Sequence, residues 1–505
     1  MTFLEQSPRV DDPPKLSLDG MFAPVADGGG DLPVLRLLID GEWRTAAETF
    51  EVRTPIDGSV IAHAQEASDD DLQAAIAAAK AARPSIRGVP AAERLAICQR
   101  AAEIVDEHVD TFVGAITVDL GKTSASSRSE TGSTIERLEM AREEVRKIFG
   151  EYLPGDWMPD TVGKQGIVIR EPLGTCAAIG PFNYPLFIPA SKIIPAITAG
   201  NAVVAKAASE DPTSLLLFAR ALEEAGLPGG VLNMLTGPGR TLGPPLAAHP
   251  DIDMVSFTGS SAVGRSLAEA AGPKPIHLEL GGNAAGIVLG AADLGVAVKS
   301  TVAGAFKNSG QRCSGLSRVL VEASVYDEYV EQALSEARAW TVGDPRHESS
   351  DIGPLVNAGA AKNVSRLVEN AVESGAELLL GGEFADAYHQ PTVLADVPLD
   401  ADIVWEETFG PVLTIVRVAD EEEAIEVANR SRYGLDSAVF TQRLDQAWRV
   451  AGALRVGMVA VNDAPEHGVG HFPFGGRTPD SGVGREGLGY SIDECTALKS
   501  VVLPG

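Results

Sequence analysis

The feature that most constrains the fold is a regular alternation of short apolar runs with longer amphipathic stretches. The short runs suit buried strands, and the longer stretches show helical spacing, as in Leu294, Val298 and Val302. Strand and helix alternating in this way predict parallel sheets with right-handed crossovers, an α/β fold. The predicted strands are residues 175–180, 201–206, 231–235, 254–258, 285–289, 318–322 and 413–418, and the predicted helices are residues 212–225, 293–307, 325–340 and 421–431, with another after Ser260.

The chain before residue 172 differs from this pattern. Residues 1–30 carry prolines, a glycine triplet and scattered acids, so we expect a flexible leader there. Residues 37–60 alternate apolar and turn residues, which indicates strands and hairpins. Helices are predicted over residues 74–83, ended by Pro84, and around residues 91–119 and 130–149, followed by a strand at residues 166–170.

Composition limits the kind of protein and its partners. The chain has 505 residues and a formal net charge of −29, which is long enough for two or three domains and unfavourable for nucleic acid, because phosphates would be repelled. The N-terminus lacks the pattern of a signal peptide. The most apolar window, residues 186–205, contains Lys192 and two prolines, so no membrane span is expected. We expect a cytoplasmic protein.

The cysteines are too few for a disulfide framework. There are four of them, and no Cys/His cluster predicts a metal site. Cys98, Cys176 and Cys495 are expected in the core or in helices.

The fourth cysteine has different surroundings. Cys313 lies between Gly310 and Gly315, on a tight backbone that suits a nucleophile, although an isolated cysteine is more often inert. Glu279 lies in an apolar, glycine-rich run, where desolvation raises the pKa of a carboxyl group toward the range of a general base. Asn183 follows the strand predicted at residues 175–180, where ligand sites of parallel sheets lie. Cys313 and Glu279 predict a covalent-catalysis pair.

A dinucleotide site is predicted less strongly. Residues 259–264 follow a predicted strand and open a predicted helix, so their amides and the helix dipole suit a pyrophosphate. The spacing is not Gly-x-Gly-x-x-Gly, and a turn between strand and helix is common. Lys206 ends another predicted strand and is a candidate partner for ribose or phosphate, although most lysines are surface residues.

From about Leu38 to Val502 the chain resembles the aldehyde dehydrogenase superfamily. In its detailed sequence, especially the Gly-Gln-Arg-Cys that ends at Cys313, the chain is most similar to the branch of non-phosphorylating glyceraldehyde-3-phosphate dehydrogenases and phosphonoaldehyde dehydrogenases. The resemblance rests on six motifs in the family's order, at residues 181–185, 257–260, 278–283, 306–315, 406–411 and 472–476.

The resemblance implies an aldehyde dehydrogenase-like fold. It has a Rossmann-like parallel-sheet cofactor domain, an α/β catalytic domain and a β-hairpin oligomerisation arm, so a homodimer or homotetramer is expected. The alternative for the arm is an ordinary hairpin packed on its own domain. The implied boundaries are residues 31–151 and 172–281 for the dinucleotide-binding domain, residues 282–480 for the catalytic domain, and residues 152–171 and 481–505 for the arm and tail.

The resemblance also implies an NAD(P) cofactor. The acid that usually holds the adenosine ribose in this family is replaced by Ser209, with Glu210 displaced by one position and still a candidate ribose ligand. A carboxylate would repel a 2′-phosphate and a hydroxyl donates to it, so NADP is favoured over NAD. The implied cofactor residues are Lys206, Ser209, Phe257, Gly259, Ser260, Gly264, Leu280, Glu407 and Phe409.

The implied chemistry is oxidation of an aldehyde to a carboxylic acid. Cys313 attacks the aldehyde, the Asn183 side-chain amide and the Cys313 backbone amide hold the oxyanion, and Glu279 activates the water that hydrolyses the thioester. Acyl transfer to coenzyme A is the alternative, and the presence of Glu279 disfavours it.

The implied substrate is a small anionic aldehyde, phosphorylated or phosphonylated, such as glyceraldehyde 3-phosphate. Two further arginines of that branch correspond here to Ser133 and His467. Arg128 and Arg137, on the same predicted helix as Ser133, are candidates to replace them or to form surface ion pairs. The alternatives are a succinic-semialdehyde-type or broad-specificity dehydrogenase and, from another class, a non-catalytic structural or binding protein. The implied substrate residues are Tyr184, Arg312, Ser314, His467 and Phe474.

Overall fold

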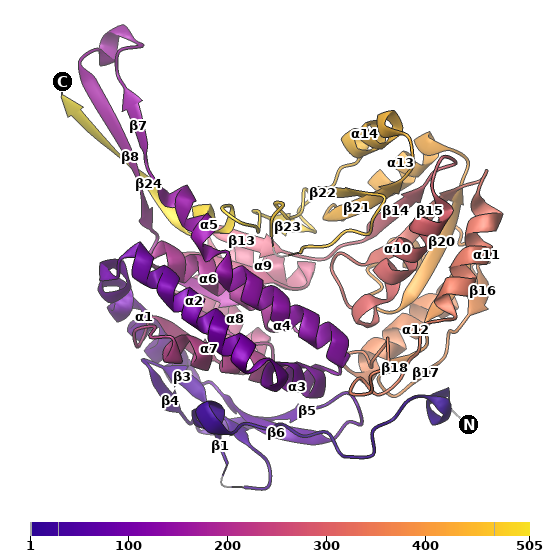
Figure 1. The fold of residues 1–505 in the computed structure, drawn as a ribbon, viewed down its shortest axis with the longest axis horizontal. Helices are drawn as coiled ribbons and strands as arrows, with labels where there is room; N and C mark the ends of the chain where they lie inside the picture. Colours follow the sequence, from indigo (N-terminus) through magenta and orange to yellow (C-terminus); the bar gives the residue numbers. More distant parts are fainter. Residues whose placement is uncertain (1–2, 29, 469, 505) are drawn as a thin grey trace.

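The computed structural model describes residues 3–28, 30–468 and 470–504. Two α/β lobes lie side by side, and a long β arm projects from the first of them (Figure 1). Each lobe contains one large, mostly parallel sheet. The predicted α/β fold class is confirmed.

The first lobe contains an eight-stranded sheet. Its five central strands run parallel, and antiparallel strands flank them at both sides. The carboxyl ends of the parallel strands therefore meet at one edge, where ligand sites of such sheets lie. In sheet order the strands are β23 (Gly482–Val483), β13 (Ile276–Glu279), β12 (Met254–Thr258), β9 (Thr175–Ile179), β10 (Ala202–Lys206), β11 (Leu232–Leu235), β3 (Leu37–Ile39) and β4 (Glu42–Arg44).

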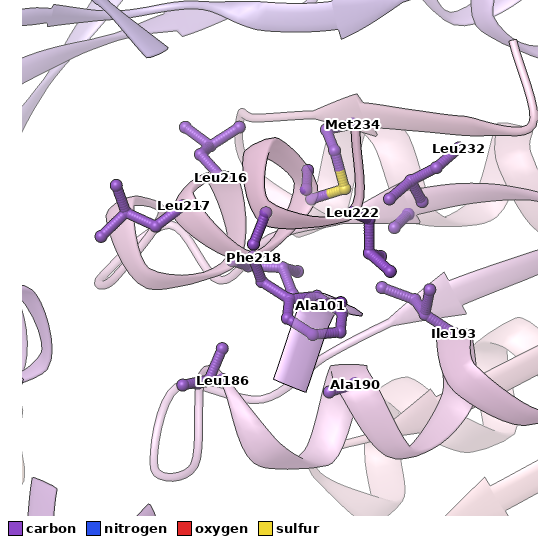
Figure 2. Close-up of a cluster of buried hydrophobic side chains, with 14 of the residues drawn as sticks. Ala101, Leu186, Ala190, Ile193, Leu216, Leu217, Phe218, Leu222, Leu232 and Met234 are labelled. Atoms are coloured by element: carbon purple, nitrogen blue, oxygen red, sulfur yellow. The ribbon is translucent and has the colours of Figure 1, made fainter. Parts of the chain in front are cut away.

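Helices cover both faces of this sheet, because alternate residues of a strand point to opposite sides. In β10, Val203 and Ala205 belong to one apolar core, whereas Ala202 and Val204 belong to the other. Figure 2 shows part of the first core, around Phe218. The first core is covered by α2 (Ala91–Glu107), α3 (Val109–Leu120), α4 (Ser124–Glu139), α6 (Phe187–Ala199) and α7 (Thr213–Glu224), and the second by α1 (Asp69–Gly88), α8 (Gly239–Ala248) and α9 (Ser261–Ala271).

The N-terminal segment packs on both lobes, with residues 16–25 on the first and residues 8–12 in contact with the second. Phe22 and Val25 are buried, and the Phe22 ring meets Phe112 edge-on at 5.8 Å. Arg346 donates hydrogen bonds to main-chain carbonyls of this segment. This packing differs from the predicted flexible leader, because apolar side chains anchor the segment. The segment contains η1 (Phe3–Gln6), η2 (Gly20–Val25) and β1 (Ala26–Asp27). β1 joins a four-stranded sheet with β2 (Val34–Leu35), β6 (Val60–Glu66) and β5 (Glu48–Arg53).

The second lobe contains a seven-stranded sheet, also with a core on each face. A short hairpin, β17 (Phe384–Ala385) and β18 (Tyr388–His389), lies outside this sheet. In sheet order the strands are β16 (Glu377–Leu380), β19 (Thr392–Ala395), β20 (Val412–Val418), β15 (Leu316–Glu322), β14 (Ala284–Val288), β21 (Asp436–Phe440) and β22 (Met458–Val461). The helices are α10 (Leu294–Phe306), α11 (Tyr326–Ala337), α12 (Ala358–Glu373), α13 (Glu421–Asn429) and α14 (Leu444–Ala453), with η6 (Asp402–Val404).

The arm is a three-stranded antiparallel sheet that joins residues far apart in the sequence. β24 (Thr496–Pro504) pairs along its whole length with β8 (Lys164–Pro172), which pairs with β7 (Glu151–Pro154). The sheet projects away from both lobes (Figure 1). Its exposed apolar side chains include Tyr152, Trp157, Val162, Leu498 and Val502.

Helix α1 continues through Pro84, which was predicted to end it. The buried residues Ala82 and Ile86 lie on either side of Pro84, and Arg83 pairs with Asp253 at 2.7 Å. These tertiary contacts hold the helix although proline removes one backbone hydrogen bond.

Two other predicted helices are subdivided. The helix predicted over residues 91–119 is interrupted at His108, whose φ and ψ of −119° and 23° are not helical. The stretch from 130 to 149 contains the end of α4, then α5 (Ala141–Val145) and η3 (Arg146–Ile148). No helix in the described part of the chain is long and apolar enough to cross a membrane.

Candidate active site

Cys313 lies in a strained loop directly after α10. Asn308 and Ser309 have φ values of 53° and 55°, a left-handed conformation that non-glycine residues rarely adopt. Gly310 follows with φ 72°, and a side chain there would overlap the backbone of Gly410. The turn leaves Cys313 partly exposed on the wall of a cavity of about 350 Å³.

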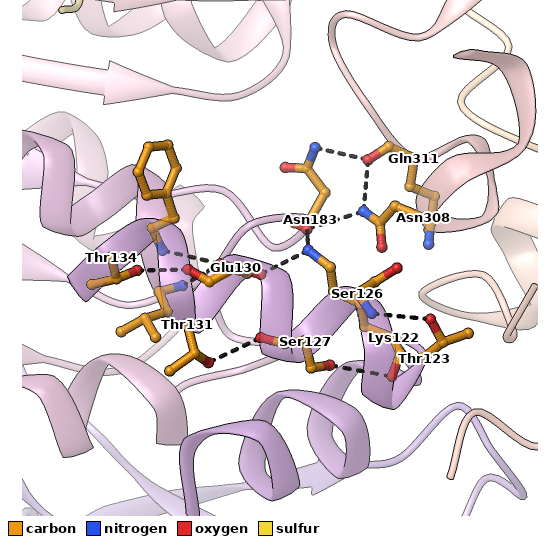
Figure 3. Close-up of polar contacts among 12 residues, drawn as sticks. Lys122, Thr123, Ser126, Ser127, Glu130, Thr131, Thr134, Asn183, Asn308 and Gln311 are labelled. Carbon is orange, nitrogen blue, oxygen red and sulfur yellow. Dashed lines mark hydrogen bonds and ion pairs between the residues drawn. The ribbon is translucent and has the colours of Figure 1, made fainter. Parts of the chain in front are cut away.

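Asn183 faces this loop from the first lobe. Its side-chain Nδ2 donates to the carbonyl of Gln311 at 2.9 Å, and Asn308 donates back to the carbonyl of Asn183 at 3.2 Å (Figure 3). Lys122 also donates to the carbonyl of Asn183, at 3.2 Å, and pairs with the buried Glu130 at 2.7 Å. This buried network connects the first lobe to the loop that carries the cysteine.

Glu279 is the last residue of β13 and lines the same cavity as Cys313. It is buried, and neither carboxylate oxygen has a hydrogen-bond partner among the described residues. Burial raises its pKa well above the ordinary value, and the charge of His277 opposes that shift. Burial first, and the charge of Asp436 second, also raise the pKa of the Cys313 thiol, so the resting sulfur is protonated.

The chain crosses between the lobes at Gly282, beside the cysteine. A side chain at residue 282 would overlap the carbonyl of Cys313, and the Gly282 amide donates to Glu407 at 3.0 Å. Burial raises the pKa of Glu407 to about 7. The lack of a side chain at Gly282 therefore allows the end of β13, the cysteine loop and Glu407 to meet.

The cavity brings together every residue predicted to bind substrate. Asn183 does not line the cavity itself, but it is hydrogen-bonded to Gln311 and to Asn308, and Asn308 lines the cavity. Ser133 also lines the cavity, as do residues that the sequence did not single out. The predicted residues on the wall are Tyr184, Arg312, Ser314, His467 and Phe474, and the additional ones include Lys122, Ser126, Ser129, Glu130, Lys307, Glu466 and Glu486.

The cavity wall carries several cations. Arg312 Nη2 donates to Ser314 Oγ at 3.3 Å and to the carbonyl of Pro465 at 3.2 Å, whereas the buried Nη1 has no partner among the described residues. Lys307 pairs with Glu466 at 2.8 Å. Arg312 Nη2 also lies 3.8 Å from Glu466 Oε1, so the guanidinium is partly paired and keeps one buried donor without a partner among the described residues.

Arg128 and Arg137 do not take the place of the branch's missing arginines. Arg128 pairs with Asp110 on the surface at 2.6 Å, and Arg137 pairs with Glu144 in the core at 2.6 Å. Neither lines the cavity. The additional cation comes from Lys122, whose ammonium lies 3.6 Å from the centre of the Tyr184 ring, and no motif in the sequence marks it.

The predicted phosphate-binding residues gather at the carboxyl edge of the first sheet. Ser260 caps α9, with its Oγ accepting from the Val263 amide at 3.4 Å. Side chains at residues 259 and 264 would overlap the Phe257 and Leu280 side chains, which would have to move to accommodate a larger residue. The start of α9 thus offers amides and a dipole suited to a phosphate.

Lys206 ends β10, and its Nζ lies 3.5 Å from Ser209 Oγ. Burial lowers the pKa of Lys206, and the charge of the exposed Glu210 opposes that shift. A cation beside a hydroxyl fits a ribose or its phosphate ester. These residues fit the adenosine end of a dinucleotide.

Phe409 and Glu407 lie toward the catalytic residues. Phe409 has a φ of 50°, and its ring meets Phe182, the neighbour of Asn183, edge-on at 5.8 Å. The left-handed backbone indicates a position fixed by its surroundings. Both residues fit the nicotinamide end of the same dinucleotide.

The model of the aldehyde dehydrogenase family matches residues 43–501. The chain belongs to this family. An NADP-dependent glyceraldehyde-3-phosphate dehydrogenase of Streptococcus equinus is 38% identical over 92% of this chain and 97% of its own length. A 3-sulfolactaldehyde dehydrogenase of Priestia aryabhattai is 36% identical, with the same coverage of 92% and 97%.

The solved structures agree with this assignment. The NADP-dependent glyceraldehyde-3-phosphate dehydrogenase of Bacillus halodurans, complexed with NADP, superposes with a TM-score of 0.91 at 36% identity, covering 93% of this chain and 99% of that one. The predicted family, fold and enzyme class are confirmed, and the chain is an NAD(P)-dependent aldehyde oxidoreductase.

Asp436 is a further acid in this region that the sequence did not mark. It begins β21 and is buried, and neither of its carboxylate oxygens has a hydrogen-bond partner among the described residues. Burial raises its pKa to about 8, although Arg312 opposes the shift. The folded protein therefore holds this proton more tightly than the unfolded chain does.

We expect Asp436→Asn to stabilise the protein increasingly as pH rises. The wild type loses stability between the ordinary pKa of an aspartate and about pH 8, because the folded state resists ionisation there, and the amide has no charge to lose. The gain over wild type should exceed about 1 kcal/mol at pH 8 and vanish near pH 4. Thermal unfolding at several pH values measures it, with Asp160→Asn on the exposed arm as control. A gain that does not depend on pH would contradict this account.

Proposed function

We propose that the protein oxidises a small anionic aldehyde to its carboxylic acid by hydrolysis of a cysteine thioester, with NADP as the preferred cofactor. The observation that carries the proposal is that Cys313, Glu279 and Arg312 share one cavity. A nucleophile, a base and a guanidinium are the groups that such a reaction needs.

Cys313 begins the reaction. Its sulfur attacks the aldehyde carbon as the thiol proton passes to solvent water, which gives an ionised thiohemiacetal on Cys313. The developing oxyanion is held by the Cys313 amide and by Asn183 Nδ2, which exchanges its present acceptor, the carbonyl of Gln311, for the oxyanion. A bound nicotinamide ring supplies the hydride acceptor. Loss of the hydride leaves an acyl thioester on Cys313.

Glu279 completes the reaction. Its carboxylate takes a proton from a water molecule as the water oxygen attacks the thioester carbon. The carbon–sulfur bond breaks, the acid is released, and the proton on Glu279 passes to the Cys313 sulfur, which restores both groups. Glu279 is buried and raised in pKa, which suits a base that works near neutral pH. A base beside the cysteine favours water over coenzyme A as the acyl acceptor.

The anionic substrate class is supported by the cations of the cavity. Arg312 presents a buried donor without a partner, and Lys122 and Lys307 lie on the same wall. The relatives are named for aldehydes that carry a phosphate and a sulfonate. Tetrahedral oxyanions of this kind match a guanidinium beside hydroxyls such as that of Ser314.

NADP is favoured over NAD by Lys206 and Ser209. The two side chains lie together at the end of β10. A glutamate at the position of Ser209 would repel a 2′-phosphate, whereas the serine hydroxyl can donate a hydrogen bond to it. Relatives and a solved structure with similar sequences are described as NADP-dependent.

We expect Cys313→Ala to abolish aldehyde-dependent formation of reduced cofactor, because no thiohemiacetal forms.

Glu279→Gln should slow steady-state turnover by about 100-fold or more while sparing the first turnover, because only thioester hydrolysis needs the base. Rapid mixing with detection of reduced nicotinamide separates the two phases. Cys98→Ala, in the core, is the control. Full turnover by Glu279→Gln would refute the assigned base.

Arg312→Gln should raise the KM for anionic aldehydes by about 10-fold or more and leave neutral aldehydes almost unchanged, because it removes a charged hydrogen bond. The panel comprises glyceraldehyde 3-phosphate, phosphonoaldehydes, sulfonated aldehydes, succinic semialdehyde and neutral aldehydes, each with NAD and NADP. A wild type that prefers neutral aldehydes would overturn the anionic class, and a preference for NAD would overturn the cofactor assignment.

The arm supports assembly into a homodimer or homotetramer. Leu498 and Val502, on the same face of β24, are exposed by 62% and 63%, and Trp157 at the tip by 77%. A projecting sheet edge with exposed apolar side chains is suited to pairing with another copy.

Leu498→Asp combined with Val502→Asp should convert the oligomer to monomers, because charges would be buried in the interface. Sedimentation velocity measures the change, and Leu444→Asp on α14, exposed by 73%, is the control. A wild type that sediments as a monomer would refute the assembly.

A further inference from the structure

A second charged cluster lies behind Glu279, outside the proposed reaction steps. His277 and Glu279 are two residues apart on β13, so their side chains project from the same face of the strand. His277 is buried, and its other neighbours come from the C-terminal part of the chain, more than 200 residues away.

Carboxylates surround the His277 ring. Nδ1 lies 2.5 Å from Glu494 Oε2, and Nε2 lies 3.5 Å from Glu486 Oε1 and 3.6 Å from Glu279 Oε1. Glu494 also accepts a hydrogen bond from the Arg485 amide at 2.9 Å, which fixes its orientation. The ring therefore has a carboxylate at each nitrogen.

Two glycines allow these contacts. A side chain at Gly484, whose φ is 99°, would overlap His277 Nδ1 and approach Glu494 Oε1. A side chain at Gly475 would come within 2.9 Å of Glu279 Oε1. The backbone thus packs directly against His277 and against one oxygen of Glu279.

Protonation of His277 brings the charges of the cluster closer to balance. Lys192 pairs with Glu486 at 2.5 Å, and His467 contacts the other oxygen of Glu486 at 3.1 Å. If His277 were neutral, the ammonium of Lys192 would face three carboxylates, those of Glu279, Glu486 and the partly exposed Glu494. Burying carboxylates without enough cations is costly. The remaining titratable groups nearby are Arg485, whose guanidinium binds main-chain carbonyls, and Cys176 and Cys495, which line a small cavity with His277.

We propose that His277 is a positioning residue that stays an imidazolium, fixed by Glu494 and Glu486, and stabilises the ionised form of Glu279 so that the base works at neutral pH. The inference rests on the proposed role of Glu279 as general base. No bond to substrate is made by His277, and its proton stays on the ring.

The direction of the pKa shifts agrees with this arrangement. Burial alone would lower the pKa of His277, but the hydrogen bond to Glu494 and the charges of Glu486 and Glu494 raise it to about 9. Burial raises the pKa of Glu279, and His277 is the largest influence that lowers it. Removing the imidazolium would raise the pKa of Glu279, so Glu279 would stay protonated up to a higher pH.

The test is the pH profile of thioester hydrolysis in His277→Gln. An opposite charge at this distance lowers a carboxyl pKa by about 1–3 units, so the acidic limb of kcat should move up by that amount. Turnover near pH 7 should fall by about 10-fold or more, recover at high pH, and leave the first-turnover burst intact. Glu494→Gln should shift the limb in the same direction by less. His347→Gln, at an exposed turn, is the matched control.

The outcomes separate this inference from the proposed function. A loss of kcat in His277→Gln that is equal at every pH, or an unmoved acidic limb, would overturn the role of His277. If Glu279→Gln keeps full turnover, the proposed general base itself fails. An acyl group retained on Cys313 in His277→Gln near neutral pH, seen by intact mass, would show that hydrolysis is the slowed step.

A direct readout is the nitrogen NMR spectrum of the histidine rings, with the His277 signals assigned by comparison with His277→Gln. We expect both His277 nitrogens to carry protons near pH 7. A neutral tautomer at that pH would overturn the inference whatever the kinetics show.

Discussion

The site depends on the close approach of two backbone segments where the chain crosses between lobes. Gly282 packs against the carbonyl of Cys313, and its amide is bound to Glu407. Because the contact involves main-chain atoms, no rotamer change can relieve an added side chain. The contact holds the end of β13, and therefore Glu279, against the loop that carries the sulfur. This backbone packing therefore sets where Glu279 lies relative to Cys313.

The second constraint is the low solvation of the site. Burial raises the pKa values of Cys313, Glu279 and Asp436 together, so the resting cavity disfavours negative charge. A reaction that needs a thiolate and a carboxylate must therefore draw on nearby cations. Arg312 on one side and the His277 cluster on the other are placed to supply them. Perturbed groups of this kind are typical of catalytic sites.

The net charge of the molecule does not describe its cavity wall, which carries cations as well as acids. The chain carries a net charge of −29, yet Arg312, Lys122 and Lys307 lie on the cavity wall. Surface acids favour solubility, and they are screened over short distances by salt. The anionic substrate proposed above would be recognised by these few local side chains within an acidic protein. The arm, with its exposed apolar residues, is a separate surface suited to assembly.

The sequence by itself determined the alternation of strands and helices and the cysteine and glutamate motifs, and its family resemblance indicated residues that line the cavity wall. These features are carried by local spacing, turns and short motifs, which are complete within a few residues. The tertiary structure decided that α1 passes through Pro84, that Lys122 and not Arg137 reaches the cavity, and that His277 lies among carboxylates. Burial and pairing between residues such as His277 and Glu494, 217 positions apart, depend on packing that no local pattern records.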